Sequence, residues 1–109
     1  MADKKIQVGY LYKTDGSIVK ILPENGKSFE LKELQAAVGG YIESLISGIP
    51  GCRQMYCNED GMTKNLPGNP HTWSVVKAGV YRLNGYSSNW RVQGNIFAVK
   101  KELPEESNA

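Results

Sequence analysis

The sequence predicts a single α+β domain, in which a mostly antiparallel sheet of about five strands is covered by one or two helices. The 109 residues leave room for one compact domain. Segments rich in β-branched and aromatic residues alternate with turn-forming residues, and one segment repeats apolar residues at helical spacing. We expect the domain to cover residues 1–103, with an acidic, disordered tail at residues 104–109.

The first half of the chain predicts a hairpin followed by a helix. Residues 6–22 contain two apolar and β-branched stretches on either side of the turn dipeptide Asp15-Gly16. Ser28 is then placed to cap a helix with three apolar residues at helical spacing, Leu31, Leu34 and Val38. Gly39-Gly40 is expected to end this helix, because glycine readily adopts the left-handed conformation found at helix ends.

The second half predicts three more strands and a short helix. We expect strands at residues 41–46, 53–57 and 92–100, the last interrupted by Gly94, and a turn at Asn58-Glu59-Asp60-Gly61. Asn69 is placed to cap a helix with Pro70 at its first position and Gly79 at its end. A competing interpretation makes residues 73–76 a strand. Residues 81–91 are rich in turn-forming residues.

The sequence contains no signal for a membrane or for secretion. No run of about 18 apolar residues occurs, and the first five residues, Met1-Ala2-Asp3-Lys4-Lys5, lack the apolar stretch of a signal peptide. We expect a soluble, cytoplasmic protein with no membrane partner.

Cys52 and Cys57 are expected to be free, buried thiols. Five positions apart in one extended strand, their Cα atoms would be too distant for an unstrained disulfide. The paired Cys-x-x-Cys spacing of structural zinc sites is absent, and we expect neither a metal nor a cofactor.

The positive charge is concentrated in the second half of the chain. Residues 1–50 hold six lysines and six acidic residues, whereas residues 51–100 hold six basic residues and only Glu59 and Asp60 as acids. The same half contains both tryptophans and many asparagines. Cations for phosphate, rings for stacking and amides for base edges are the groups that a nucleotide requires. The alternative is that these residues form turns, half-buried strands and a solvated basic face.

The sequence gives little support for catalysis or for binding of duplex DNA. His71 is the only histidine, with no nucleophile or orienting carboxylate assignable by spacing. Neither a phosphate loop ending in Gly-Lys-Ser/Thr nor a Gly-x-Ser-x-Gly motif occurs. We therefore predict that the protein is not an enzyme. A net charge of +2 provides too little counterion release for a typical duplex binder.

Several short motifs together resemble a known family. They are Tyr41-Ile42-Glu43, Tyr56-Cys57-Asn58-Glu59-Asp60-Gly61, Leu66-Pro67-Gly68-Asn69-Pro70 and Gly94-Asn95-Ile96-Phe97-Ala98-Val99. In this combination the chain resembles, over residues 17–100, a domain-of-unknown-function family of small phage and bacterial proteins. Residues 77–91 depart from the family pattern, being longer and richer in Tyr, Asn and Ser. The resemblance implies a phage or mobile-element origin, and it implies no particular activity.

We expect a phage counter-defence protein that binds and sequesters a small nucleotide-like signal, such as a cyclic oligonucleotide or an ADP-ribose derivative. Such a protein acts by mass action, and we expect a homo-oligomer that encloses the ligand between copies. One alternative is a protein that inhibits a host defence or transcription component by docking on it. A second alternative is an accessory protein that binds single-stranded nucleic acid.

The hypothesis assigns ten ligand-binding residues and no catalytic residue. Arg53, Lys64 and Arg91 are assigned to phosphate, Tyr56, Trp73 and Trp90 to stacking, and Asn58, Glu59, Asn65 and Asn69 to polar contacts. Asn58 and Asn69 have a competing assignment, because at a turn and at a helix start their side chains also satisfy local backbone groups.

Overall fold

The computed structural model describes residues 4–104 and contains a five-stranded antiparallel sheet with three short helices. The elements are β1 (Ile6–Tyr12), β2 (Ile18–Ile21), α1 (Leu31–Val38), β3 (Ile42–Ser44), β4 (Cys52–Asn58), α2 (Thr72–Val75), α3 (Ala78–Leu83) and β5 (Ile96–Glu102). The strand order is β2-β1-β5-β4-β3, so the last strand of the chain lies in the centre of the sheet. The predicted α+β class and number of strands are confirmed, with three helices in place of one or two.

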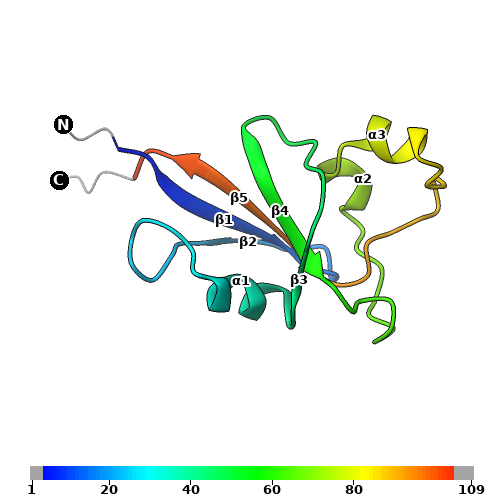
Figure 1. Cartoon of the computed structure of the whole chain (residues 1–109), viewed down its shortest axis with the longest axis horizontal. Coiled ribbons are helices and arrows are strands. Elements are labelled where there is room, and N and C mark those ends of the chain that lie inside the picture. Colours follow the sequence, from blue (N-terminus) through cyan, green and yellow to red (C-terminus); the bar gives the residue numbers. More distant parts are fainter. Residues whose placement is uncertain (1–3, 105–109) are drawn as a thin grey trace.

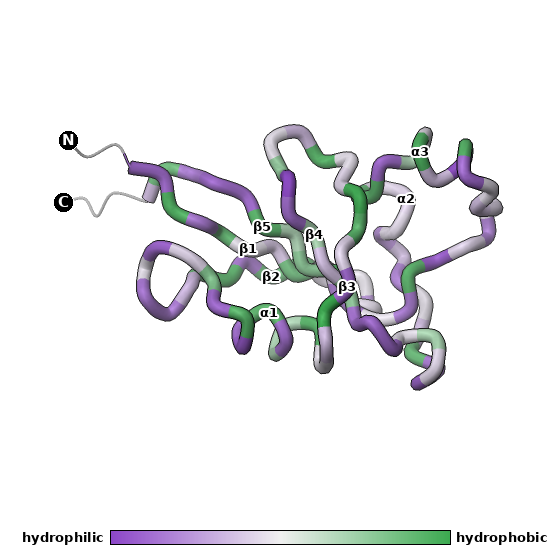
Figure 2. Tube along the Cα trace, in the orientation of Figure 1, coloured by the Kyte–Doolittle hydropathy of each residue, from purple (hydrophilic) through white to green (hydrophobic). Residues whose placement is uncertain are grey.

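The strand β5 organises the core, because its side chains alternate between two hydrophobic clusters. Ile96 and Ala98 face the side covered by α2 and α3, whereas Phe97 and Val99 face the side covered by α1. All four residues are buried. Figure 1 shows α1 below the sheet and α2 and α3 at one end of it. Figure 2 shows hydrophobic residues in the middle of the sheet and a mainly hydrophilic loop between β2 and α1.

The hairpin of β1 and β2 forms around the predicted turn. The Asp15 carboxylate accepts hydrogen bonds from the Ser17 N–H (2.8 Å) and the Ser17 hydroxyl (2.6 Å). Gly16 has a φ of 94°, a conformation that side-chain-bearing residues rarely adopt. These hydrogen bonds lower the pKa of the Asp15 carboxyl group.

The helix α1 begins later than predicted. Its N-cap is Glu30, and the Glu33 carboxylate accepts a hydrogen bond from the Glu30 N–H (2.8 Å). The prediction of Ser28 as the cap is wrong, because the Asn25 side chain accepts the Ser28 N–H (2.9 Å) in a turn that precedes the helix. The predicted end is confirmed, with Gly39 at a φ of 80°.

The helix predicted from Asn69 to Gly79 is divided into α2 and α3. The N-cap of α2 is His71, so the prediction of Asn69 as the cap is wrong, because the Asn69 side chain is bonded to other segments. Val76 is extended and forms an isolated antiparallel bridge with Ser47. The Lys77 N–H donates to the Ile46 carbonyl oxygen (2.9 Å), which joins the interruption to the segment after β3. The competing prediction of a strand at residues 73–76 is wrong for residues 73–75, which are helical, and only Val76 is extended. Tertiary pairing with a distant segment therefore overrides the local helical pattern.

The boundaries of the later strands also differ from the prediction. β3 is limited to three residues, and β4 begins one residue early, at Cys52. β5 begins at Ile96 and extends to Glu102, because Gly94 (φ 113°) and the backbone around it form a bend before the strand. No helix within residues 4–104 is both long enough and apolar enough to cross a membrane. The tail prediction concerns residues 104–109, of which residues 105–109 lie outside the described part of the chain.

The close approach of β1 and the Phe97 ring requires glycine at position 9. A Cβ atom added to Gly9 would lie 2.2 Å from Cζ of Phe97 and 3.0 Å from Cζ of Phe29. Phe97 is almost completely buried, and its ring packs edge-to-face on Phe29 with centroids 5.2 Å apart. A side chain at position 9 would therefore displace the rings that hold α1 against the sheet.

We predict that Gly9→Ala lowers the free energy of unfolding by roughly 1–3 kcal/mol, the usual cost of overpacking a core. Urea denaturation followed by circular dichroism measures this change. Gly79→Ala is the matched control, because nothing lies within 4 Å of a Cβ atom at this helical position. It should leave stability equal or higher. Equal stability of wild type and Gly9→Ala would contradict the packing argument.

Candidate functional site

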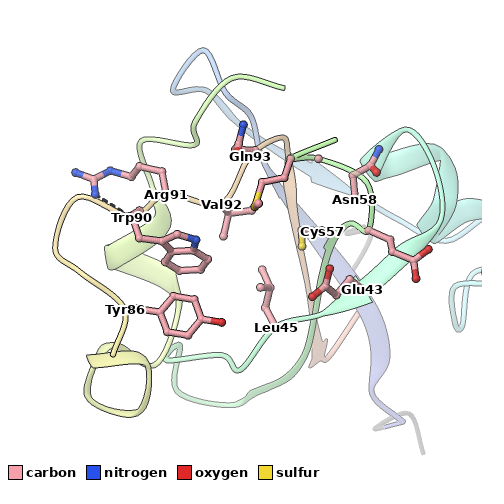
Figure 3. Close-up of a pocket in the computed structure, with 12 residues that line it drawn as sticks. Glu43, Leu45, Cys57, Asn58, Tyr86, Trp90, Arg91, Val92 and Gln93 are labelled. Atoms are coloured by element: carbon pink, nitrogen blue, oxygen red, sulfur yellow. Dashed lines mark hydrogen bonds between the residues drawn. The ribbon is translucent and has the colours of Figure 1, made fainter. Parts of the chain in front are cut away.

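A cleft opens where the end of β4 meets the segment that returns from α3 to β5. It has a volume of about 210 Å³. We call it the aromatic cleft, and it is lined by Glu43, Leu45, Cys57, Asn58, Glu59, Gly61, Met62, Tyr86, Trp90, Arg91, Val92 and Gln93. Figure 3 shows the Tyr86 and Trp90 rings on one side of it and Glu43 and Asn58 on the other.

The aromatic wall of the cleft is a packed cluster of rings. Trp90 lies edge-to-face with Tyr86 at a centroid distance of 4.7 Å and stacks on Tyr81 at 5.3 Å. Trp73 packs against Trp90 from outside the cleft, with centroids 5.7 Å apart. Because Tyr81 stacks on Trp90 and its hydroxyl accepts the Ile46 N–H (3.0 Å), the wall is attached to the segment after β3. Its rings are therefore held in place by contacts within the protein.

The opposite side of the cleft is acidic. Glu43 and Glu59 both line it and both are exposed. Glu43 is paired with Cys57 in the register of β3 and β4, so its position is determined by the sheet. Ionised carboxylates only accept hydrogen bonds. The cleft is consequently suited to a ligand that presents hydrogen-bond donors.

Cys57 is buried beside the acidic side of the cleft. Burial, together with the negative charge of Glu43, raises the pKa of the Cys57 thiol to about 12. A thiol with this pKa remains protonated near neutral pH and is a poor nucleophile. Both cysteines are free and buried, so this prediction is confirmed.

Asn58 lines the cleft, but its side chain is engaged in the fold. Its amide donates to the Val38 carbonyl oxygen at the end of α1 (3.1 Å), and its side-chain oxygen accepts the Asp60 N–H (2.7 Å). These bonds join α1 to the turn after β4. The contacts correspond to the competing, structural assignment for this residue.

Arg91 is on the rim of the cleft and turns away from it. Its Nη1 atom donates to the carbonyl oxygens of Ser88 (2.8 Å) and Trp90 (2.9 Å). Figure 3 shows the guanidinium group pointing away from the space between the rings and Glu43. In this conformation the guanidinium group holds the loop before β5 and does not face the interior of the cleft.

The cleft brings together four of the ten predicted residues, Asn58, Glu59, Trp90 and Arg91. The remaining six lie elsewhere. Arg53 lines a separate hollow between β1, β4 and β5, Lys64 lines a hollow beside Gly39 and Leu66, and Tyr56 packs in the cluster under α1. Asn65 is in a turn with a φ of 56°, Trp73 packs behind Trp90, and Asn69 is completely buried.

Asn69 holds two distant segments together. Its side-chain amide donates to the carbonyl oxygens of Tyr12 (2.8 Å) and Gly94 (3.0 Å), and its side-chain oxygen accepts the His71 N–H (2.9 Å). The end of β1 and the bend before β5 are thereby fixed to the start of the α2 region.

Glu43 and Tyr86 were not among the predicted site residues. Glu43 belongs to a short edge strand, and only the register of β3 on β4 brings it beside Cys57. Tyr86 follows α3 and reaches the cleft because its ring packs on Tyr81 at 5.1 Å. The one sequence signal available for Tyr86 is its place in the aromatic and turn-rich stretch of residues 81–91.

Within residues 4–104, no group of three or more His, Cys, Asp and Glu side chains is placed to hold a metal ion. His71 packs edge-to-face on Tyr12, and its Nε2 atom lies 2.8 Å from the Gly16 carbonyl oxygen. The histidine is thus bound to the first hairpin.

The fold and the cleft define a small α+β protein with a ring-lined, acidic cleft at the end of an antiparallel sheet. The chain belongs to the family described as Domain of unknown function (DUF3846), which matches residues 10–107. The predicted membership of a domain-of-unknown-function family is thereby confirmed, over a longer span than residues 17–100. No curated protein and no solved structure matches the chain.

We predict that Asn69→Ala lowers the free energy of unfolding by roughly 2–4 kcal/mol, because it removes three hydrogen bonds and leaves buried backbone groups unsatisfied. Urea denaturation measures the loss. Asn89→Ala serves as the control, since this asparagine is exposed, and its effect should stay within about 0.5 kcal/mol. Comparable effects of the two substitutions would contradict the role given to Asn69.

The raised pKa of Cys57 predicts a loss of stability at alkaline pH. The thiol ionises near its ordinary value of 9.0 in the unfolded chain but only at about 12 in the folded protein. The folded state therefore binds more protons between these values, and the free energy of unfolding falls as pH rises through them. Urea denaturation at about pH 8 and about pH 10 measures the free energy of unfolding, which should fall more between these pH values for wild type than for Cys57→Ala. An equal fall in the two proteins would show that Cys57 does not cause the loss of stability at alkaline pH.

Proposed function

We propose that the protein is a non-enzymatic binding protein that takes one amino-bearing base of a small nucleotide-like signal into the aromatic cleft. The observation that carries this proposal is the presence of the Tyr86 and Trp90 rings and the Glu43 and Glu59 carboxylates around one concavity. Rings supply surface for a flat ligand, and carboxylates accept hydrogen bonds from the exocyclic amino group of a base.

The size of the cleft limits what it encloses. Its volume of about 210 Å³ is below the roughly 300–1,000 Å³ of sites that enclose a whole drug-sized ligand. We expect the cleft to hold one base, with the sugar and phosphate groups of the ligand extending beyond its rim. A homo-oligomer that places a second copy over the rim would enclose more of the ligand, and we include this state in the proposal.

The acidic side of the cleft argues against phosphate inside it. A phosphate beside Glu43 and Glu59 would experience like-charge repulsion, and the Arg91 guanidinium is turned outward. We therefore place base recognition within the cleft and phosphate recognition outside it, and the site gains Glu43 and Tyr86, which the sequence did not predict.

Sequestration follows from binding without turnover. A protein present in excess over its ligand holds the free concentration of the ligand below the level that a receptor requires. In a phage-infected cell this would act as counter-defence when the ligand is a nucleotide signal of the host. The proposal places the protein in the host cytoplasm.

A second candidate is inhibition of a host protein by docking on the rim of the cleft. Met62 lines the cleft and is 75% exposed, and Leu83 at the end of α3 is 87% exposed. Tyr86 lies close to Leu83 in sequence and is 40% exposed. Exposed apolar side chains of this size are typical of protein-binding surfaces when they are contiguous.

We predict that Glu43→Gln weakens binding of the nucleotide-like ligand by roughly 1–3 kcal/mol, because an amide nitrogen replaces an acceptor oxygen. Thermal shift assays with cyclic dinucleotides, cyclic trinucleotides and ADP-ribose derivatives first identify the ligand, and calorimetry then compares the variants. Glu24→Gln is the matched control, because Glu24 lies beside α1 outside the aromatic cleft.

Three results would contradict the base-binding proposal. The first is equal weakening by Glu43→Gln and Glu24→Gln. The second is the absence of any thermal shift across the panel together with co-purification of a host protein, which would favour the second candidate. Salt-dependent retention of single-stranded oligonucleotides in place of small ligands would also contradict it.

A further inference from the structure

A second hollow lies between the start of β1, the start of β4 and the end of β5, and it differs in charge from the aromatic cleft. Its volume is about 740 Å³, within the range of small-molecule sites. Four cations line it, Lys5, Arg53, Lys100 and Lys101, and we call it the basic groove. Figure 1 shows the start of β1 and the end of β5 at one end of the molecule, with α2 and α3 at the other.

The topology of the sheet gathers these cations from distant parts of the chain. Lys101 is paired with Gln7 of β1, and Val99, on the same face of β5, is paired with Gln54 of β4, whereas Lys100 leaves β5 on the opposite face. Adjacent strands are separated by about 4.8 Å, so long basic side chains from three neighbouring strands can reach one ligand. The sequence alone places Lys5 almost fifty positions from Arg53.

A β-bulge sets Arg53 apart from the regular ladder. The register of β4 on β5 shifts between Cys52 and Gln54, which leaves Arg53 without a partner residue on β5. Arg53 is exposed and lines the groove. A β-bulge changes the direction of a side chain. Here the side chain is that of Arg53, whose planar guanidinium group suits phosphate.

The four cations have no ion-pair partner among residues 4–104. Lys32 and Glu24 form an ion pair, and both lie outside the groove. The one carboxylate that lines the groove, Glu102, accepts a hydrogen bond from the Tyr10 hydroxyl (2.7 Å). Within residues 4–104, the positive charge of the groove is therefore largely uncompensated.

We propose that the basic groove is a binding site for a small polyphosphate anion, separate from the aromatic cleft. Arginine binds phosphate oxygens in a bidentate manner, and lysines add point charges at several positions along a multiply charged chain. Gln7 and Gln54, which also line the groove, form a hydrogen bond with each other (3.4 Å) and add neutral polar contacts. The ligand class is a di- or triphosphate group, either free or part of a nucleotide.

Calorimetric titration with inorganic tripolyphosphate at low salt tests this site without any base. Arg53→Gln and Lys101→Gln should each weaken binding about tenfold or more. Lys77→Gln is the matched control, because it removes the same charge from an exposed residue next to α3, and it should change the dissociation constant less than twofold. Urea denaturation of all variants checks that folding is retained.

Three outcomes would overturn the proposal. They are no binding of tripolyphosphate by the folded wild type, equal weakening by Lys77→Gln and Arg53→Gln, and tighter binding of a single-stranded oligonucleotide than of tripolyphosphate. Comparison of a nucleoside triphosphate with free tripolyphosphate distinguishes the two sources of the anion. A nucleoside without phosphate tests the aromatic cleft alone. Absence of binding at the cleft can therefore be distinguished from absence of binding at the groove.

Discussion

The burial of β5 on both faces is the constraint on which the rest of the structure depends. Its residues fill one hydrophobic cluster with Ile96 and Ala98 and the other with Phe97 and Val99. This central strand is the last strand in the chain, and it pairs with both β1 and β4. The segment between β4 and β5 must leave the sheet and return to its middle, and this excursion carries α2, α3 and the aromatic wall.

Two buried asparagines fix the excursion to the sheet. Asn58 binds the end of α1 and the turn after β4, whereas Asn69 binds the end of β1 and the bend before β5. No buried side-chain nitrogen or oxygen in the described part of the chain lacks a hydrogen-bond partner. A buried amide is costly when unsatisfied, so these residues specify one arrangement of the loops around the cleft.

The fold separates charges that are mixed along the sequence. Glu43 and Glu59 line the cleft at the end of β4, and Arg53 lies at the beginning of β4, in a groove shared with cations from β5 and from just before β1. The net charge of +2 thus conceals an acidic cleft and a basic groove at different places on one sheet. The two proposed sites would favour different chemical groups, since carboxylates accept hydrogen bonds from donors and cations attract phosphate.

Local chemistry in the sequence determines the hairpin turn at Asp15-Gly16, the end of α1 at Gly39 and the number of strands, because these depend on residues close together in the chain. The position of β5, the division of α2 from α3 at Val76 and the partners of Arg53 depend on pairing between segments far apart. The sequence shows that rings, amides and cations follow Gly51, but the prediction that they form one site required convergence, and the cleft contains only four of the ten residues. Only the tertiary structure decided that Trp90 and Glu43 line one cleft and that Arg53 lies outside it, because strand register and chain topology set their positions.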